Sequence, residues 1–455
     1  MGIALFETAA YEEAISELDQ AIDKKVADAR TYFSRGLTRY QLTEQGHEEA
    51  RVQGFEQVIA DLNQAVEQGF ITKEALFCRG NARFQLQQYK ESLLDLNRAV
   101  EMGADDATTY YRRGFANYES KNYDEALQDL NKAISKQPEL GDAYAVRANT
   151  RFRLKDYQAA LSDYDQAVEK GINDPVIFNN RGKTKFLLDR YDASVPDFDE
   201  AIRLDPDYTL AYENRGITHF RLGNFEAAKN DLRQVEIAEA ATPTILYYLA
   251  DAHFEMENYA VAIGYYDLAI EEGVQEKQAY YRRGMSHFKR ENYAQASVDL
   301  SNAITMDKED KQMYIDRATV YTYLYEFDAA IADFNRVLKL DPENTNVYYN
   351  RAYLREELED YDGAIKDYSE VIARSPKDAA AYYNRANLKI LLEDVEGALQ
   401  DFSKAIENNA EEAEYYRGRA TAYYQLGDSQ ACNDWKQAKT LGDDRADFFL
   451  KKYCE

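Results

Sequence analysis

The feature that most constrains this chain is a repeat of 34 residues that runs without slippage through most of its length. A small residue marks the same point of each repeat. These anchors are Gly80, Gly114, Ala148, Gly182, Gly216, Ala250, Gly284, Ala318, Ala352, Ala386 and Ala420. Two more stand upstream, Gly36 at 44 residues before Gly80 and Gly2 at 34 residues before Gly36. The chain therefore holds about thirteen repeats, the first without its opening residues and the second with ten extra residues near 43–54.

Each repeat is predicted to form two helices. After the anchor Gly114, apolar residues recur at helical spacing along one face. They are Tyr123, Ala126, Leu130, Ala133 and Ile134. Asn122 is predicted to cap this second helix, and Asp174 with Pro175 reads as the N-cap and first residue of another helix. Because a lone hairpin cannot bury its apolar face while stacked neighbours can, the sequence predicts one all-α array.

A helix–turn–helix of 34 residues with this pattern resembles the tetratricopeptide repeat (TPR), and the resemblance covers essentially the whole chain. With the anchor numbered 8 as in that family, Tyr or Phe matches at position 4, Tyr at 17 and Ala at 20 and 27. The resemblance implies a right-handed superhelical solenoid of about thirteen TPR units. Its first helices line a concave groove and its second helices the convex side. Residues 1–441 are assigned to the array and 442–455 to a C-terminal capping helix.

Two charged positions vary together across the repeats. Position 7 is arginine in Arg35, Arg79, Arg113, Arg147, Arg181, Arg215, Arg283, Arg317, Arg351, Arg385 and Arg419. Position 23 of the same repeats is aspartate, in Asp61, Asp95, Asp129, Asp163, Asp197, Asp231, Asp299, Asp333, Asp367, Asp401 and Asp434. The one complete repeat without the arginine has Leu249, and Tyr265 at position 23. We infer an ion pair between the two helices of each repeat, with a structural role.

Composition excludes several functions. The net charge of −27 argues against nucleic acid as a partner. The longest uncharged stretch, 240–250, is too short to span a membrane. No signal peptide is visible in the first residues, so the prediction is cytoplasmic, with the bacterial periplasm or cell envelope as the alternative if a signal peptide was removed. No phosphate loop, HExxH motif or nucleophile elbow occurs, so neither enzyme activity nor a cofactor is predicted.

Aromatic residues recur at positions that line the groove of TPR proteins, which are 2, 5, 6, 9, 12 and 13. Position 12 is aromatic in Phe6, Tyr40, Phe84, Tyr118, Phe152, Phe186, Phe220, Phe254 and Phe288. Position 5 adds Phe33, Phe77, Tyr111, Tyr247, Tyr281, Tyr349 and Tyr383. The strip at position 12 then ends, at Thr322, Glu356 and Ile390. The rings pack neighbouring first helices together, or they contact a bound polypeptide, and both roles are compatible.

Asparagine occupies position 6 in two adjacent pairs, Asn180 with Asn214 and Asn350 with Asn384. Amides can bond a ligand backbone, and the pattern resembles part of the asparagine ladder of the O-linked N-acetylglucosamine transferases. The carboxylate clamp of chaperone-binding TPR domains needs Lys at position 5, which no repeat has. Many bases stand at positions 7 and 11 and some at position 6, as Arg112 and Arg282 do, whereas acidic residues are concentrated in the second helices and turns. The groove is therefore predicted to be less acidic than the convex side, and acidic or aromatic peptides are the preferred ligands.

Three histidines, His219, His253 and His287, stand at position 11 of consecutive repeats. Stacked helices lie about 8–10 Å apart, whereas zinc–nitrogen bonds need about 2 Å, so no metal site is predicted. Other repeats have Arg or Lys at position 11, which indicates that this position accommodates a side chain with a basic end group.

The cysteines are few. Cys432 lies ten residues before Gly442 and Cys454 twelve after it, so antiparallel helices make them near neighbours. The ending resembles that of bacterial TPR proteins with a terminal cysteine. A disulfide and two reduced cysteines both fit, and a disulfide implies an oxidising compartment. Cys78 is predicted to be a lone packed thiol.

The function predicted is a non-enzymatic scaffold that binds a protein or peptide segment in its groove. The first alternative is a structural component of a multiprotein assembly, such as secretion or envelope machinery, that uses the ends and the convex face. The second is the regulatory portion of an enzyme. Three irregularities mark further candidates. They are the ten extra residues near 43–54, which lengthen helices or form a loop, the repeat anchored at Ala250, and Pro196, which is predicted to kink its helix.

Overall fold

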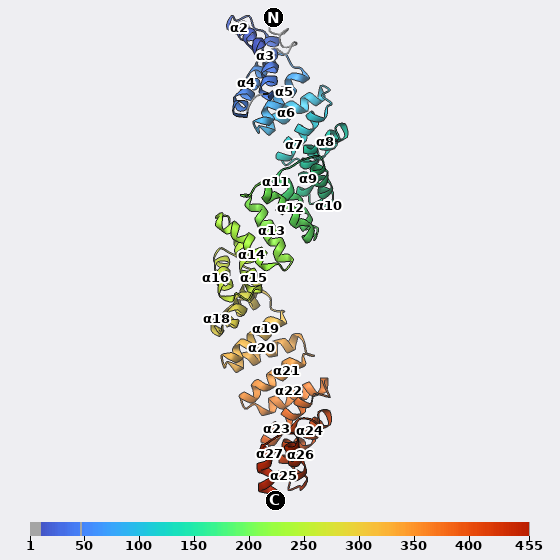
Figure 1. Cartoon of the computed structure of the whole chain (residues 1–455), viewed down its shortest axis with the longest axis vertical. Coiled ribbons are helices and arrows are strands. Elements are labelled where there is room, and N and C mark those ends of the chain that lie inside the picture. Colours follow the sequence, from blue (N-terminus) through green and yellow to red (C-terminus); the bar gives the residue numbers. More distant parts are fainter. Residues whose placement is uncertain (1–10, 46–47, 455) are drawn as a thin grey trace. The chain divides into compact units, whose positions relative to one another are not determined.

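Every element that the structure describes is an α-helix, and the described residues hold no strand (Figure 1). The structure is a computed structural model that describes residues 11–45 and 48–454, so Gly2 and Phe6 lie outside it. The chain divides into an N-terminal segment, Met1–Ala240, and a C-terminal segment, Ala241–Glu455. The two segments are described separately.

The N-terminal segment alternates first and second helices. Its first helices are α3 (Ala29–Gln45), α5 (Lys73–Gln85), α7 (Ala107–Glu119), α9 (Gly141–Arg153), α11 (Pro175–Leu187) and α13 (Thr209–Arg221). Its second helices are α2 (Tyr11–Asp23), α4 (Glu48–Glu67), α6 (Tyr89–Glu101), α8 (Tyr123–Lys136), α10 (Tyr157–Glu169), α12 (Tyr191–Leu204) and α14 (Phe225–Ile237).

The C-terminal segment continues the same alternation. Its first helices are α15 (Pro243–Glu255), α17 (Lys277–Lys289), α19 (Lys311–Tyr323), α21 (Thr345–Glu357), α23 (Ala379–Leu391) and α25 (Ala413–Gln425). Its second helices are α16 (Tyr259–Glu271), α18 (Tyr293–Met306), α20 (Phe327–Leu340), α22 (Tyr361–Arg374), α24 (Val395–Asn408) and α26 (Gln430–Thr440). A last helix, α27 (Arg445–Tyr453), follows.

Within each segment, every helix packs against the next along the chain, and consecutive first helices also touch, as α5 touches α7 and α15 touches α17. The predicted repeat of two stacked helices is therefore confirmed. Asp174 caps α11 as predicted, because its side chain accepts a hydrogen bond from the backbone N–H of Val176 at 2.7 Å. Asn122 is the N-cap residue of α8 as predicted, but its side chain makes no capping hydrogen bond, and its amide donates to Asn117 Oδ1 at 3.4 Å.

The small anchor is explained by its close approach to the second helix of its own repeat. A Cβ added at Gly114 would lie 2.9 Å from Leu130 Cγ, which is too close. Leucine also stands at the equivalent position in most other repeats with a glycine anchor. Repeats with an alanine anchor have a flat ring there, at Tyr164, Tyr266, Phe334, Tyr368, Phe402 and Trp435. The anchor therefore varies with the shape of the side chain that it meets.

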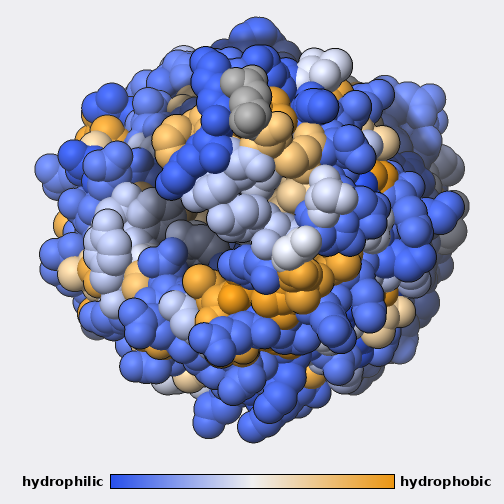
Figure 2. All heavy atoms as spheres, turned by 90° about the horizontal axis from the view of Figure 1, so that it is seen from below, coloured by the Kyte–Doolittle hydropathy of each residue, from blue (hydrophilic) through white to orange (hydrophobic). Residues whose placement is uncertain are grey.

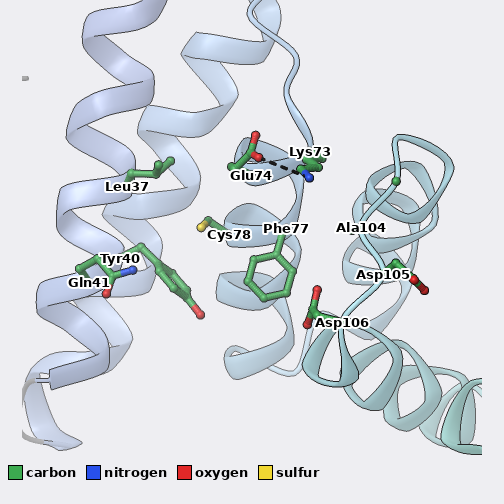
Figure 3. Close-up of a pocket in the computed structure, with 11 residues that line it drawn as sticks. Leu37, Tyr40, Gln41, Lys73, Glu74, Phe77, Cys78, Ala104, Asp105 and Asp106 are labelled. Carbon is green, nitrogen blue, oxygen red and sulfur yellow. Dashed lines mark ion pairs between the residues drawn. The ribbon is translucent and has the colours of Figure 1, made fainter. Parts of the chain in front are cut away.

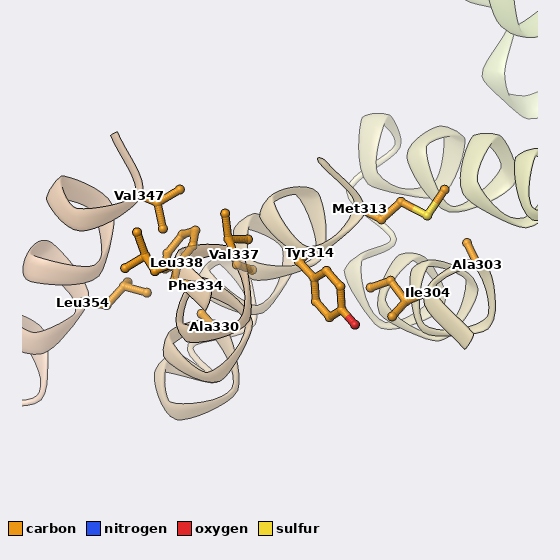
Figure 4. Close-up of a cluster of buried hydrophobic side chains, with 11 residues drawn as sticks. Ala303, Ile304, Met313, Tyr314, Ala330, Phe334, Val337, Leu338, Val347 and Leu354 are labelled. Carbon is orange, nitrogen blue, oxygen red and sulfur yellow. The ribbon is translucent and has the colours of Figure 1, made fainter. Parts of the chain in front are cut away.

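Buried clusters extend from one repeat into the next. In the C-terminal segment, Phe334 and Val337 of α20 belong to the same buried cluster as Tyr314 of α19 and Val347 and Leu354 of α21 (Figure 4). Val337 is fully buried and Val347 is 1% exposed. Each hairpin therefore completes its core with the residues of the next one.

The predicted Arg–Asp pairs are confirmed in all eleven repeats. In α9, for example, Arg147 donates from Nε to Asp163 Oδ2 at 2.8 Å and from Nη2 to Oδ1 at 2.7 Å. Its Nη1 also donates to Asn131 Oδ1 of the preceding repeat at 2.7 Å. The sequence did not reveal this third contact. Its acceptors are Asp19, Asn63, Asn97, Asn131, Asp165, Asp199, Asp267, Ser301, Asn335, Ser369 and Ser403.

The one complete repeat that lacks the arginine also lacks the two side chains that would bond to it. Leu249 and Tyr265 replace the pair, and the residue at the acceptor position before Leu249 is Arg233, which cannot accept a hydrogen bond. All three positions therefore differ where the arginine is absent.

The remaining irregularities are local. The ten extra residues lengthen helices, since α3 has 17 residues and α4 has 20, whereas α5 has 13. Pro196 lies inside α12, which runs unbroken from Tyr191 to Leu204. The kink there stays a prediction.

The last helix is fastened to the one before it. A disulfide joins Cys432 of α26 to Cys454, directly after α27, with the two Cα atoms 5.7 Å apart. The ring of Phe449 in α27 stacks on Trp435 of α26, with centroids 5.3 Å apart. Trp435 is 1% exposed, so α27 helps to bury the last aromatic core.

Candidate functional site

The aromatic strip at position 12 closes the helical hairpins. Each half-buried ring packs against the aromatic residue that begins the second helix of its own repeat, at position 17. The pairs are Phe84–Tyr89, Tyr118–Tyr123, Phe152–Tyr157, Phe186–Tyr191, Phe220–Phe225, Phe254–Tyr259 and Phe288–Tyr293, with centroids 5.1–6.1 Å apart. Packing between neighbouring first helices, which the sequence suggested, occurs at Phe84, whose ring lies 5.1 Å from that of Phe115 in α7.

Two of the four candidate asparagines are bonded inside the N-terminal segment. Asn180 donates from Nδ2 to Asn149 Oδ1 at 3.1 Å, and Asn214 donates to Asn179 Oδ1 at 2.8 Å. These bonds join each first helix to the one before it. The two amides therefore hold neighbouring repeats in register.

The two candidate asparagines of the C-terminal segment have different surroundings. Asn384 donates from Nδ2 to the hydroxyl of Tyr349 at 2.6 Å, so it also links neighbouring first helices. Asn350 is exposed and lines a cavity.

Two candidate tyrosines at position 5 are held by their neighbours. The ring of Tyr111 meets that of Phe115 at 6.3 Å, and burial raises the pKa of its hydroxyl to about 12. The hydroxyl of Tyr281 donates to Asp316 Oδ2 at 2.8 Å. Burial, followed by the bond to this carboxylate, raises the pKa of Tyr281.

A cavity of about 300 Å³ opens on the first helices of the C-terminal segment. Its lining residues are Thr319, Thr322, Tyr323, Phe334, Tyr349, Asn350, Tyr353 and Leu354. Thr322 stands at position 12, where the aromatic strip has just ended. Because threonine is much smaller than phenylalanine, the space that a ring fills in earlier repeats is open here.

A second cavity, of about 560 Å³, lies in the N-terminal segment (Figure 3). Its lining residues are Leu37, Tyr40, Gln41, Lys73, Glu74, Phe77, Cys78, Gly103, Ala104, Asp105 and Asp106. Tyr40 of α3 and Phe77 of α5 extend into the space between these helices (Figure 3). Burial raises the pKa of the Cys78 thiol to about 12, so this cysteine is a neutral packed side chain.

The two cavities occupy the same place in the repeat. In each, one first helix supplies positions 9, 12 and 13, and the next first helix supplies positions 5 and 6. The position-12 residues of the two cavities are Tyr40 and Thr322, and the position-6 residues are Cys78 and Asn350. These are the positions at which the TPR resemblance places the groove.

Family models describe the same repeat. Models of the tetratricopeptide repeat match residues 80–121, 107–140 and, in overlapping runs, 146–431. The chain belongs to the tetratricopeptide repeat family. TPR arrays are in general scaffolds for protein interactions, and this chain is such an array.

Several solved TPR structures resemble parts of this chain. MamA from Desulfovibrio magneticus RS-1 is 21% identical, over 37% of this chain and 97% of that chain, with a TM-score of 0.34. A tetratricopeptide repeat protein from Parabacteroides merdae is 17% identical, over 53% and 95%, with a TM-score of 0.37. The pilF protein of Pseudomonas aeruginosa is 20% identical, over 44% and 92%, with a TM-score of 0.37. No curated protein sequence matches this one.

The TPR unit anchored at Ala250 holds a buried ionic cluster that sequence reasoning missed. Tyr266 donates its hydroxyl to Asp251 Oδ1 at 2.5 Å. Arg282 Nη1 lies 3.2 Å from Asp251 Oδ1 and 3.0 Å from Glu255 Oε1. Asp251 is 3% exposed, and burial raises its pKa. Asp251, Glu255 and Arg282 all stand at groove positions, so the groove here has one guanidinium placed between two carboxylates.

The bases at positions 7 and 11 of the TPR units face the second helices. Position 7 pairs with the aspartate at position 23, and position 11 reaches the same carboxylate. The second set of pairs is Arg39–Asp61, Arg83–Asp95, Arg151–Asp163, Lys185–Asp197, Arg355–Asp367 and Lys389–Asp401. The use of the bases at positions 7 and 11 in predicting a less acidic groove is therefore wrong, because they pair with aspartates inside their hairpins. The part that rests on Arg112 and Arg282 at position 6 stays a prediction.

The histidines replace these basic residues at position 11. The ring of His253 stacks on that of Tyr265, with centroids 5.6 Å apart. Burial lowers the pKa of His287. Among the described residues, no group of three or more His, Cys, Asp or Glu side chains is placed to hold a metal ion. Within the same residues, no helix has the length and apolar character needed to cross a membrane.

Proposed function

We propose that this TPR array is a non-enzymatic scaffold that binds a polypeptide segment in the groove lined by its first helices. The observation that carries the proposal is the recurrence of a cavity at the same repeat positions in each segment of the chain. Volumes of about 300 and 560 Å³ fall in or near the range of side-chain and small-ligand sites. A segment lying along the first helices would place side chains into such cavities.

Site-specific photo-crosslinking tests this proposal in the full chain. A photoreactive phenylalanine analogue is placed at Gln41 or Asn350, which line the two cavities. The matched controls are Leu94 and Val298 on second helices, whose side chains are 71% and 60% exposed. Crosslinks to a partner from the groove sites alone support the proposal. Crosslinks from the second-helix sites alone would overturn it.

The labelled sites are chosen away from the rings that close the hairpins. Phe152 and Phe186 pack against Tyr157 and Tyr191, so alanine at these positions would open the hairpins as well as alter the groove. A loss of binding in such variants would have two explanations, whereas a crosslink from Gln41 or Asn350 has one.

The alternative, a structural component of a larger assembly, draws support from the end of the chain. The surface seen from the C-terminal end carries apolar patches among mostly hydrophilic residues (Figure 2). On the last helix, Phe448 is 61% exposed. A photoreactive residue at Phe448 that captures the partner when Asn350 and Gln41 do not would favour this alternative.

The disulfide favours an oxidising compartment, such as the periplasm or cell envelope, over the cytoplasm. Trapping the thiols of the native chain in cells with acid, followed by alkylation after unfolding, tests this. Labelling of Cys78 alone supports the oxidising compartment, and labelling of all three cysteines supports the cytoplasm.

A further inference from the structure

The cavity of the C-terminal segment is unusual for its exposed tyrosines. Tyr323 and Tyr353 are 54% and 51% exposed, whereas Phe334 at its floor is 3% exposed. Tyr323 is held in place, because its ring stacks on Tyr293 with centroids 5.0 Å apart. The cavity therefore has a buried aromatic floor and aromatic walls that are partly exposed to solvent. Rings of this kind bring large contact area at low entropy cost.

The polar groups of this cavity include both acceptors and donors. The hydroxyls of Thr319 and Thr322 donate their protons to backbone carbonyls of their own helix, at 2.9 and 2.8 Å, so they offer a ligand only acceptor lone pairs. Tyr349 accepts a hydrogen bond from Asn384 and keeps its own proton to donate. The exposed amide of Asn350 can donate or accept. Tyr349 and Asn350 therefore offer donors to the carbonyls of a ligand that lies against the aromatic walls.

The charge around the cavity is negative. Across the three TPR units of α19, α21 and α23, the groove positions hold Asp316, Glu356 and Glu357 and neither lysine nor arginine. The nearby bases Arg355 and Lys389 are paired with aspartates of the second helices. Because no cation at a groove position offsets these carboxylates, their field is available to a positively charged ligand.

The groove positions of the N-terminal segment differ. From α5 to α13, the groove positions hold equal numbers of acidic and basic residues. They hold Glu74, Glu119, Asp142 and Glu213 against Arg112, Arg153, Lys183 and Arg221. The unbalanced negative charge beside exposed tyrosines thus belongs to the groove of α19–α23 and is not a general property of the array.

We propose that the cavity between α19 and α21 takes a basic, proline-containing segment of a partner protein. This inference rests on the proposed function and names the chemistry of its ligand. Proline-rich segments dock on aromatic-lined grooves in an extended, preformed helix. Proline presents a carbonyl acceptor, to which Tyr349 and Asn350 can donate. Arginine or lysine beside the prolines complements Asp316, Glu356 and Glu357.

Fluorescence anisotropy with labelled peptides on the full chain tests the proposal. The probe carries a Pro-X-X-Pro motif flanked by arginines. A second peptide has glutamate in place of arginine, and a third keeps the arginines but has alanine in place of proline. The first is expected to bind tightest, by about tenfold over each of the others. Equal or tighter binding of the glutamate peptide would overturn the charge assignment, and equal binding of the alanine peptide would overturn the role of proline.

Variants of the chain locate the binding. Tyr353→Ala is expected to weaken binding of the arginine peptide about tenfold, and Tyr353→Phe, which keeps the ring, less. Glu357→Gln is expected to reduce the salt dependence of the affinity. The matched controls are Leu268→Ala and Glu271→Gln, two exposed positions on the second helix α16, and both should leave the affinity unchanged. Circular dichroism checks that each variant keeps its helices.

The outcomes separate this inference from the proposed function. If the arginine peptide fails to bind, or binds Tyr353→Ala as well as the original chain, the ligand chemistry is wrong. Crosslinking from Asn350 and Gln41 to a partner would then still support groove binding. If no groove position crosslinks and the second-helix positions do, the proposed function itself fails.

Discussion

Replacement of Arg317 by leucine is expected to destabilise the C-terminal segment by about 3–5 kcal/mol, because it strands a buried carboxylate. Asp333 is 5% exposed and accepts from Arg317 Nε at 2.8 Å and from Nη2 at 2.7 Å. The same guanidinium donates to Ser301 of the preceding repeat at 2.9 Å. It also lies over the ring of Tyr314, 5.7 Å from the centroid. The carboxylate therefore loses both of its bonds to Arg317 while it remains buried.

A second substitution should restore most of this loss. Asp333→Tyr alone leaves a desolvated guanidinium and is expected to cost a similar amount. Together, Arg317→Leu and Asp333→Tyr reproduce the residues that the repeat of Leu249 and Tyr265 carries naturally. The double variant is expected to lose only about 1–2 kcal/mol, which covers the lost hydrogen bond from Arg317 to Ser301 and imperfect packing. The coupling between the two substitutions is then several kcal/mol.

Amide hydrogen exchange measured by mass spectrometry suits this test, because a repeat array does not unfold as one unit. Arg317→Leu should accelerate exchange in α19 and α20 by more than about 100-fold, since each 1.4 kcal/mol is tenfold. The double variant should return most of that protection. The control is Lys404→Leu, which breaks an exposed pair with Glu407 and should leave exchange unchanged. A double variant whose loss equals the sum of the single losses would refute the buried pair.

Three further outcomes follow from the packing and the titrating groups. Gly114→Ala should lower the thermal midpoint, with a cost of about 1–3 kcal/mol from the clash with the second helix, whereas Gly264→Ala, with nothing within 4 Å, should raise it. Because burial lowers the pKa of His287, its contribution to stability is complete above the ordinary value of about 6.5 and is lost as pH falls below it. His287→Arg should therefore shrink the fall in thermal midpoint between neutral and mildly acidic pH. A thiol reagent should find no reactive cysteine in the native chain, Cys78 after unfolding, and all three after unfolding and reduction.

The repeat period made the fold predictable, and covariation made part of its interior predictable. Leu249 stands where eleven other repeats have arginine, and Tyr265 stands where the same repeats have aspartate. The loss of both charges within one repeat identified the partners and showed that they belong to the same hairpin. The third contact, to position 25 of the preceding repeat, stayed hidden because its acceptors are a mixture of Asn, Asp and Ser.

The candidate site was predictable in position but not in detail. The groove positions of the family led to Tyr349 and Asn350, which line a cavity. The sequence could not distinguish rings that line the groove from rings that close the hairpin, because both sets share a spacing. Only the contact between Phe152 and Tyr157 and its equivalents in other repeats decides this. The cluster around Asp251 was not predicted, because its partner Arg282 lies in the next repeat.

Stability and recognition therefore depend on different positions of the repeat. The pairs between positions 7 and 23 and the small anchor recur through the array, because they join the two helices of a hairpin. The cavity of the C-terminal segment lies where a single half-buried groove position departs from the common aromatic residue, with Thr322 at position 12. Since a change of one exposed or half-buried side chain costs little stability compared with a change in the buried pair, such positions are free to vary. A repeat array can in this way acquire a new binding cavity without altering the contacts that hold its hairpins together.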